Sequence, residues 1–369
     1  MSMFLEQNRL HKKSSPWNNG VRCHLEEVRD ELTQVYQDLQ PVDAVVPTNA
    51  LHLDLAVRGD HAALYRKGSE GMSVPLGMSK HGFNTLCNRA GFPGYMGSNL
   101  LKTAGLGEPG RKVATLMADL WLRKATSEVL LRTVNDENGK RMVRFTGSDT
   151  YGILANLDII EMLLNSKARD WPVVDWMLSE KALRLTQVHP DCDSLDLNKY
   201  HKALRTWNSE TGSAKARFDS GGVRPVCSNG IWNFTSGCSI TARHREGSIA
   251  KLHDRFEAGF DSLIAHSQGF FDAYDQALET TIDDAFKWIE GEVSHELTDT
   301  EMNRVFEGMK HETSGPIGLL ENVFDAVTWA AQGATDEYRQ AEMEVLAGQV
   351  LRHGLSQARE GRIPVLIEA

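Results

Sequence analysis

The sequence predicts an α+β protein in which a central antiparallel sheet is backed by helices and followed by an elongated helical C-terminal region. Three observations predict this class. Strand-like runs at 129–134 and 141–146 flank the turn dipeptide Asn138-Gly139. After residue 246, apolar residues recur at helical spacing. A length of 369 residues is too great for one ordinary core, so the chain is expected to be modular.

The first predicted region, residues 1–125, combines an N-terminal arm with a mixed helical part. Acidic and long side chains at 25–39 indicate a helix, which Pro41 stops. Ser79 is a candidate N-cap for a helix carrying Phe83 and Leu86. The exposed face of that helix offers few cations, so packing is its expected role.

The second predicted region, residues 126–245, is a basic β-rich core domain. Strand alternation places Arg132 and Arg144 on the face opposite Leu131 and Val143, which predicts a sheet that is apolar beneath and cationic above. A helix at 156–165 is expected to pack behind it. A second meander is predicted from three strands, at 222–227, 231–234 and 239–243, with its first turn at Asn229-Gly230.

The third predicted region, residues 246–369, is acidic and helical. It holds 24 Asp and Glu against 9 Lys and Arg, a net charge of −15, whereas residues 1–245 carry +5. Phe256 and Phe260 belong to an apolar stripe on one or two long helices, and Thr298 with Glu301 forms a capping box. Exposed phenylalanines on long helices would favour a homo-oligomer.

Composition excludes several classes of protein. No apolar run approaches the roughly 18 residues of a membrane span, and no hydrophobic leader follows the basic start. Five cysteines without regular spacing argue against a disulfide framework and for a reducing compartment. The expected location is therefore the cytoplasm, with no membrane partner.

Five short segments occur in a recognisable order across residues 77–247. They are Leu131-Arg132-Thr133-Val134, the run 148–156, the run 208–213, the run 226–230, and Arg243-His244-Arg245. Together they resemble the phage/plasmid-like protein family, a domain of unknown function carried by phages, prophages and conjugative plasmids. The resemblance implies a bacterial host cell and mobile-element biology, and it supplies no catalytic residues.

Clustered cations with interleaved aromatic residues are typical of proteins that bind single-stranded nucleic acid without sequence preference. We therefore expect sequence-independent single-stranded DNA binding, with strand annealing as an extension, in phage or plasmid DNA metabolism, without bond chemistry or a cofactor. The predicted binding residues are Arg132, Arg141, Arg144, Lys202, Arg205, Trp207, Lys215, Arg217, Arg224, Trp232, Arg243 and Arg245.

Three alternatives stay open on the sequence. The acidic helices could instead act as an anti-defence factor or capture a host protein, or they could fold back and neutralise the basic region. A metal-dependent nuclease is the third alternative; its candidate ligands are His189, Cys192, Cys227, Cys238 and His244 for zinc, and Asp149, Asp158 and Glu161 for magnesium. Glu210 is expected to pair with Arg205 or Arg243 as a structural contact.

Overall fold

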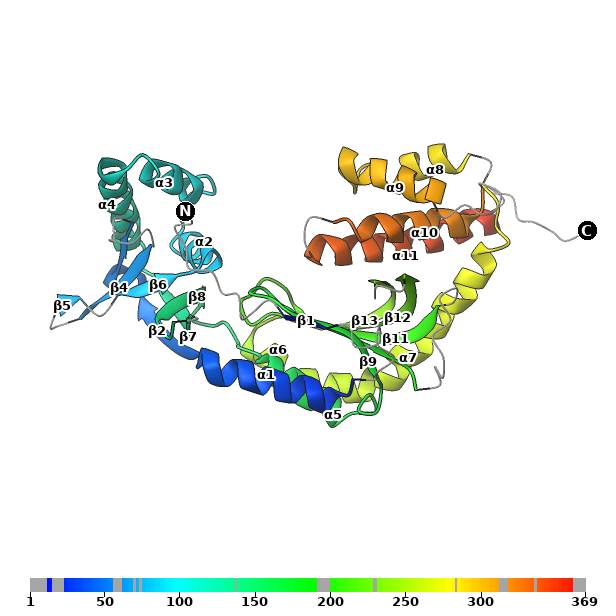
Figure 1. Ribbon diagram of the computed structural model, residues 1–369, viewed down its shortest axis with the longest axis horizontal. Helices are drawn as coiled ribbons and strands as arrows, with labels where there is room; N and C mark the ends of the chain where they lie inside the picture. Colours follow the sequence, from blue (N-terminus) through cyan, green and yellow to red (C-terminus); the bar gives the residue numbers. More distant parts are fainter. Residues whose placement is uncertain are drawn as a thin grey trace, which may run out of the picture.

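The computed structural model confirms the α+β class and contains two separate sheets rather than one (Figure 1). It describes residues 12–14, 23–55, 62–68, 71–72, 75–136, 138–190, 200–227, 231–282, 284–311, 318–334 and 337–360. Within these ranges, none of the helices combines the length and apolar character needed to cross a bilayer.

The sheet formed largely by the first region is here called the N-terminal sheet. Its strands, in spatial order, are β2 (Val42–Pro47), β7 (Glu128–Asn135), β8 (Arg141–Ser148), β6 (Leu76–Met78), β4 (Ala63–Gly68) and β3 (Leu51–Asp54), and β5 (Gly71–Met72) pairs with β4. The β6–β8 pair is parallel and the others are antiparallel. This sheet continues across the boundary predicted at residue 126.

The hairpin of β7 and β8 forms as the sequence predicts, with Gly139 at φ +73° and the Asp136 side chain accepting from the amides of Asn138 and Lys140. Its partners, however, are β2 and β6 from the first region. The hairpin therefore does not belong to the same sheet as the later strands.

The second sheet, the central sheet, is antiparallel throughout. Its order is β1 (Lys12–Ser14), β9 (Val173–Leu178), β10 (Leu183–Val188), β11 (His201–Asn208), β12 (Ala216–Cys227) and β13 (Ile231–Ala242). The three-stranded meander predicted for 222–243 is instead a pair of long strands, β12 and β13. The predicted strands at 231–234 and 239–243 are both parts of β13, which runs without a break. The predicted turn at Asn229-Gly230 lies outside the described residues.

Helices cover each sheet (Figure 1). The N-terminal sheet packs against α2 (Lys80–Arg89), α3 (Met96–Ala104) and α4 (Glu108–Lys124), and the 3-10 turn η3 (Thr48–Ala50) leads into β3. One face of the central sheet packs against α1 (Leu25–Leu39), α5 (Asn156–Leu164) and α7 (Leu252–Ala277), with the short α6 (Glu246–Ile249) before α7. The predicted helices at 25–39 and 156–165 are confirmed, and the Ser79 side chain caps α2 by accepting from Gly82 N.

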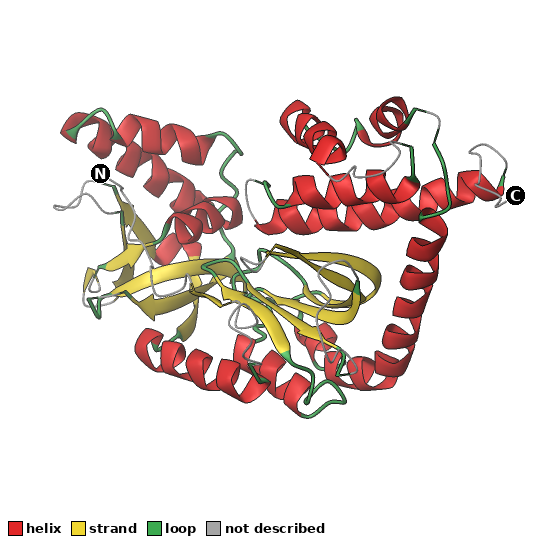
Figure 2. Ribbon diagram, turned by 45° about the vertical axis from the view of Figure 1, so that its right-hand side comes forward, coloured by secondary structure: helices red, strands yellow, loops and turns green. Residues whose placement is uncertain are grey.

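The remaining helices form a module over the other face of the central sheet, which we call the C-terminal module (Figure 2). It consists of α8 (Ala285–Val293), α9 (Asp299–His311), α10 (Leu320–Ala331) and α11 (Glu337–Arg359), with its own apolar core. The Thr298–Glu301 capping box is present at the start of α9. The acidic region therefore folds back over the basic one.

The phenylalanine stripe does not provide an exposed face for oligomers. Phe256 and Phe260 are buried against the central sheet, and Phe270 packs into the core of the C-terminal module, because α7 runs along the sheet and then into that module. Large exposed apolar side chains gather instead on α4, at Val113, Leu116, Met117 and Leu120.

Candidate nucleic-acid interface

The central sheet has one apolar and one polar face. Leu204 and Phe218 point into the core with α1, α5 and α7, whereas alternation turns their neighbours toward the C-terminal module. We call this second surface the polar face, defined by Asp175, Arg184, Thr186, Arg205, Trp207, Arg217 and Asp219. Sequence reasoning missed Arg184 and Asp175, although the alternation in Leu183-Arg184-Leu185-Thr186 could have revealed a strand with a polar side.

Helix α11 covers part of the polar face through polar contacts. Arg205 forms a buried ion pair with Glu344 and also donates to Thr186 Oγ1 at 3.3 Å. Arg184 pairs with Asp175 at 2.9 Å and reaches Gln340 of α11 at 3.4 Å. Burial lowers the pKa of Arg205, and the opposing charge of Glu344 does not fully offset this effect.

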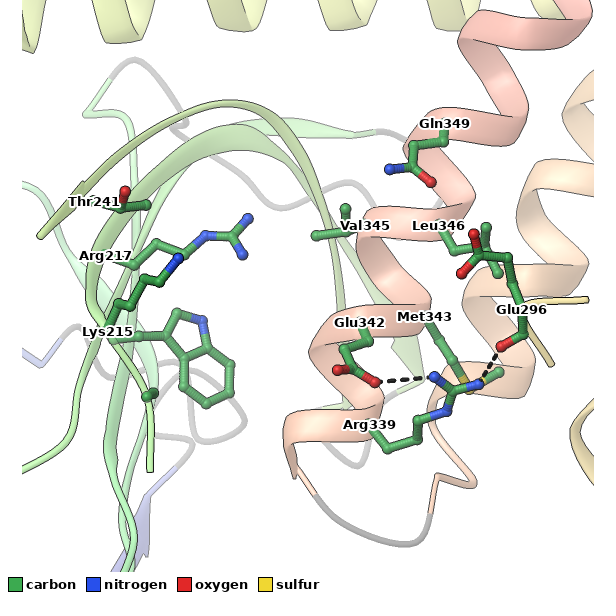
Figure 3. A pocket seen from close by; sticks show the side chains of 12 residues that line it. Lys215, Arg217, Thr241, Glu296, Arg339, Glu342, Met343, Val345, Leu346 and Gln349 are labelled. Carbon is green, nitrogen blue, oxygen red and sulfur yellow. Dashed lines mark hydrogen bonds and ion pairs between the residues drawn. The ribbon is translucent and has the colours of Figure 1, made fainter. Parts of the chain in front are cut away.

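A cavity of about 540 Å³ lies beside these contacts, between the sheet and the C-terminal module. Figure 3 shows Lys215 and Arg217 on the sheet side and Glu342, Arg339 and Glu296 on the side of the module. Trp207 and Thr241 complete the sheet wall, and Met343, Leu346 and Gln349 line the opposite wall. One wall is therefore basic and aromatic, and the other carries carboxylates.

The cations of the sheet wall differ in how they are held. Arg217 donates to Asp219 at 2.5 Å and keeps 31% of its side chain exposed, and Lys215 is exposed. Because β12 begins at Ala216 opposite the last residue of β13, Arg243 and Arg245 follow at the same end of the strand pair, where both are exposed. The structure thus brings four of the predicted cations to one end of β12 and β13.

Trp207 is largely buried, at 5% exposure, and the Arg184 guanidinium lies 5.9 Å from the centre of its ring. The predicted stacking role for this residue therefore requires the indole to become accessible. In this structure the Trp207 ring packs against Arg184 and also borders the cavity.

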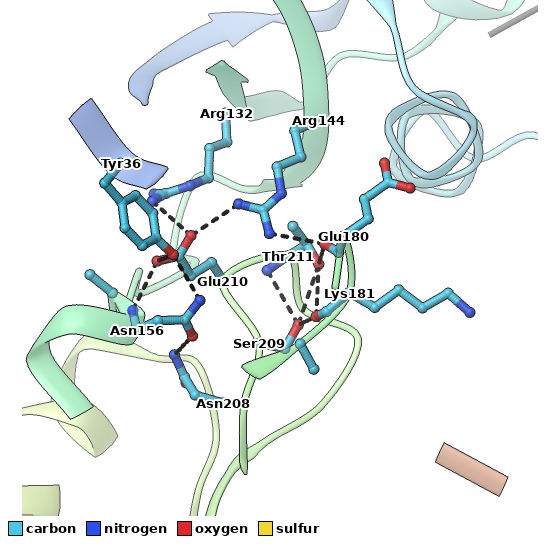
Figure 4. A network of polar contacts seen from close by, with 12 residues as sticks. Tyr36, Arg132, Arg144, Asn156, Glu180, Lys181, Asn208, Ser209, Glu210 and Thr211 are labelled. Atoms are coloured by element: carbon cyan, nitrogen blue, oxygen red, sulfur yellow. Dashed lines mark hydrogen bonds and ion pairs between the residues drawn. The ribbon is translucent and has the colours of Figure 1, made fainter. Parts of the chain in front are cut away.

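Arg132 and Arg144 do not belong to an open groove, which corrects the expectation from the sequence. Both are buried and both pair with Glu210, at 3.3 Å and 3.1 Å respectively. Figure 4 shows Glu210 between them, where it also accepts from the Tyr36 hydroxyl at 2.7 Å and from the Asn156 amide at 2.9 Å. The two arginines face the space between the two sheets rather than solvent.

The expected partner of Glu210 was also wrong, since neither Arg205 nor Arg243 contacts it. Although burial alone would raise the pKa of Glu210, the charges of Arg132 and Arg144 and the surrounding hydrogen bonds hold it below its usual value. Burial and the nearby Glu210 charge raise the pKa of Tyr36. No local pattern marks Tyr36 or Asn156 in the sequence, because both reach Glu210 from distant positions.

The other predicted residues are scattered. Arg141 is half-buried and donates to the Gln40 carbonyl, and Lys202 is half-buried on the sheet face opposite Arg205. Arg205 is wholly enclosed by its pairing with Glu344, so it is not an accessible cation. In the pairing of β12 with β13, Arg224 lies opposite Asn233 and Trp232 lies opposite Pro225, and the side chains of Arg224 and Trp232 fall outside the described residues.

Among the residues that the structure describes, no group of three His, Cys, Asp or Glu side chains could hold a metal ion. His244 stacks on Tyr151, with ring centres 5.3 Å apart, and Asp158 accepts from Ala155 N at the start of α5. Cys192 and the side chains of Cys227 and Cys238 fall outside the described residues.

Comparison with known proteins adds no relative: no family model, no curated protein and no solved structure matches this chain.

Proposed function

We propose that the protein binds single-stranded nucleic acid, without sequence preference, along the polar face of the central sheet. The observation that carries the proposal is the cavity wall on which Lys215, Arg217 and Trp207 meet. Cations that neutralise phosphates and an aromatic surface for base stacking are what such binding requires. Arg243 and Arg245 extend the positive surface at the same end of the strand pair.

Helix α11 covers part of the polar face on which a strand would lie, so binding involves displacement of α11 from the sheet. The contacts holding this end of α11 to the sheet are polar, namely Arg205 with Glu344 and Arg184 with Gln340. The far end of the module is anchored by apolar packing of Tyr200, Phe270 and Phe324. Nucleic acid and α11 would compete for the same arginines, which makes binding a population shift between closed and open forms.

The test is fluorescence anisotropy with labelled single- and double-stranded oligonucleotides across a salt series. The variant Lys215→Ala with Arg217→Ala removes two cations from the cavity wall. It should weaken binding and lower the slope of log affinity against log salt by about one for each lost phosphate contact. An equal loss of oligonucleotide affinity in this variant and in a control that removes two cations elsewhere would contradict the proposal.

The matched control is Lys112→Ala with Lys167→Ala, which removes two exposed cations that lie on α4 and behind the central sheet. Binding by this control should stay close to that of the unmodified protein. Strand cleavage in the same assay would favour the nuclease alternative.

The proposal includes the wider setting that the sequence resemblance implies. The protein would act on DNA of a phage or plasmid in the bacterial cytoplasm, with strand annealing as a possible extension of binding. Self-association also stays a prediction, and light scattering of the purified protein tests it. The exposed residues of α4, rather than the phenylalanines of α7, provide its apolar surface.

A second candidate function rests on the outer face of α7. Asp254, Glu257, Asp261, Asp272 and Asp275 recur at helical spacing and are exposed along one side of this 26-residue helix. Such a row of carboxylates could imitate a phosphate backbone and capture a host protein that binds DNA. Failure of every oligonucleotide to bind would favour this anti-defence or host-interaction role.

A further inference from the structure

A second cavity, of about 330 Å³, lies at the edge of the N-terminal sheet, whereas the polar face belongs to the central sheet. It is lined by Asn49, Leu51, His52, Lys67, Asp119 and Arg123. These residues come from η3, β3, β4 and α4, so four elements converge on it. Its volume falls at the lower end of the range for small-molecule sites.

Asp119 organises this cavity with both of its carboxylate oxygens. Its Oδ1 accepts from Leu53 N at 3.2 Å, at the free edge of β3, and its Oδ2 lies 2.5 Å from His52 Nδ1. Leu55 N donates to Thr115 Oγ1 at 2.8 Å, so α4 already covers the strand edge through a second contact. The amides of Leu53 and Leu55 at this strand edge therefore have acceptors on α4 without the contact between Asp119 and His52.

The contact with Asp119 fixes the orientation of the His52 ring. When Nδ1 donates to the carboxylate, Nε2 is the nitrogen left for a ligand. Among the described residues, none hydrogen-bonds this nitrogen. The Tyr65 ring, 5.7 Å from the imidazole centre, supports the same ring position from β4.

The charges around His52 favour an anion. Lys67 is exposed, and Arg123 keeps 66% of its side chain exposed, with its guanidinium 3.9 Å from Asp119 Oδ2. The carboxylate is engaged by its two hydrogen bonds, so both cations can turn toward a ligand. The imidazolium form of His52 can donate from both ring nitrogens, to Asp119 through Nδ1 and to a bound anion through Nε2.

We propose that this cavity is a binding site for the phosphate group of a phosphate monoester, held by His52 Nε2, Lys67 Nζ and the Arg123 guanidinium. A monoester carries up to two negative charges and three terminal oxygens, which matches three cationic donors from three separate elements. Asn49, an exposed residue of η3, also lines the cavity and adds a polar side chain to it. This site is independent of the nucleic-acid interface on the central sheet.

The experiment is isothermal titration of the full chain with inorganic phosphate, with acetate as a competing anion. His52→Asn retains an amide donor for Asp119 but removes Nε2, and Arg123→Ala removes a largely exposed cation. Each change should weaken phosphate binding about tenfold or more, the value of one charge-assisted hydrogen bond. Lys112→Ala removes a cation of α4 that pairs with Glu108 outside the cavity and should leave binding unchanged.

Two further arms identify the source of the phosphate. An oligonucleotide with a 5′-phosphate should bind here more tightly than its 5′-hydroxyl counterpart if the monoester is a strand end, and a free nucleoside monophosphate should match it if the ligand is small. Absence of saturable phosphate binding, equal affinity for acetate, or an equal loss in Lys112→Ala would overturn the proposal. If His52→Asn fails to fold, Arg123→Ala alone decides the outcome.

Discussion

Glu210 and Glu344 are both buried carboxylates paired with buried arginines, yet the balance between burial and pairing differs between them. At Glu210, two arginines, a tyrosine hydroxyl and a backbone amide outweigh burial, and the pKa of the carboxyl falls. At the other pair, burial outweighs the attraction of Glu344, and the pKa of Arg205 falls. The first cluster joins the two sheets as a fixed part of the fold, whereas the second holds a helix against a polar surface at a net cost.

The largest expected effect is on the first cluster. Glu210→Gln leaves Arg144 buried without a carboxylate and should lower the free energy of unfolding by about 3–5 kcal/mol, the usual cost of breaking a buried pair. Urea denaturation followed by circular dichroism measures it. A loss below about 1 kcal/mol would mean that water reaches the arginines when Glu210 is neutral.

The pH dependence of the same variant sharpens the comparison. Because the pKa of Glu210 is lowered in the folded state, its stabilisation is fully present above the unfolded carboxyl pKa of about 4.3 and is lost as the pH falls through the folded value. The difference in stability between the unmodified protein and Glu210→Gln should therefore be constant from pH 7 to about 5 and shrink in more acidic solution. A difference that grew on acidification would have the wrong sign.

The second cluster should respond in the opposite way to replacement of the whole pair. Arg205→Met combined with Glu344→Leu removes two buried charges and takes away the partners of Thr186 and Gln340. The free energy of unfolding should stay unchanged or rise by up to about 4 kcal/mol, as buried ion pairs often do when replaced by apolar residues. Thermal and urea denaturation report the change, and a clear loss of stability would show that this pair holds the fold as Glu210 does.

Breaking only the α11 side of this pair tests the competition with nucleic acid. Glu344→Gln removes the charge that pairs with Arg205 in the closed form and should favour the open form by about 1–3 kcal/mol, the usual range of coupling between two sites, which raises oligonucleotide affinity about fivefold or more. Anisotropy at one fixed salt concentration measures it. As a control, Glu290→Gln changes an exposed carboxylate of α8 and should leave the affinity unaltered. Equal affinity of Glu344→Gln and the unmodified protein would remove α11 as a competitor.

Local features of this fold are well predicted by the sequence, since they depend on residues close together in the chain. Ser79 caps α2, Gly139 takes the positive φ of the hairpin turn, and Thr298 with Glu301 begins α9. Each of these features is decided within about four residues.

The site was predicted less well. The alternation of side chains along a strand assigns each residue to one of two faces, but it does not show which part of the chain packs on either face. Arg132 does lie on the strand face opposite that of Leu131. That face contacts Glu210, 78 positions away in the chain, rather than solvent. Arg205 likewise meets Glu344 of a helix 139 positions away. Lys215 and Arg217 do lie on an accessible surface, because the Asp219 carboxylate that contacts Arg217 leaves 31% of its side chain exposed and Lys215 itself is exposed.

The smallest expected effect lies at Glu301, which pairs with Arg339 at 2.7 Å and caps α9. Hydrogen bonds from Arg339 lower the pKa of Glu301 to about 2, so its contribution is present above the unfolded value of about 4.3 and lost as the pH falls toward 2. Arg339 is partly exposed, so solvent replaces much of what Glu301→Gln removes, and the loss should be about 1 kcal/mol or less. Urea denaturation at pH 7 and pH 3 measures it. A loss as large as that of Glu210→Gln would show that the partial exposure of Arg339 does not weaken its pair with Glu301, and that the contact between α9 and α11 matters to the fold as much as the junction of the sheets.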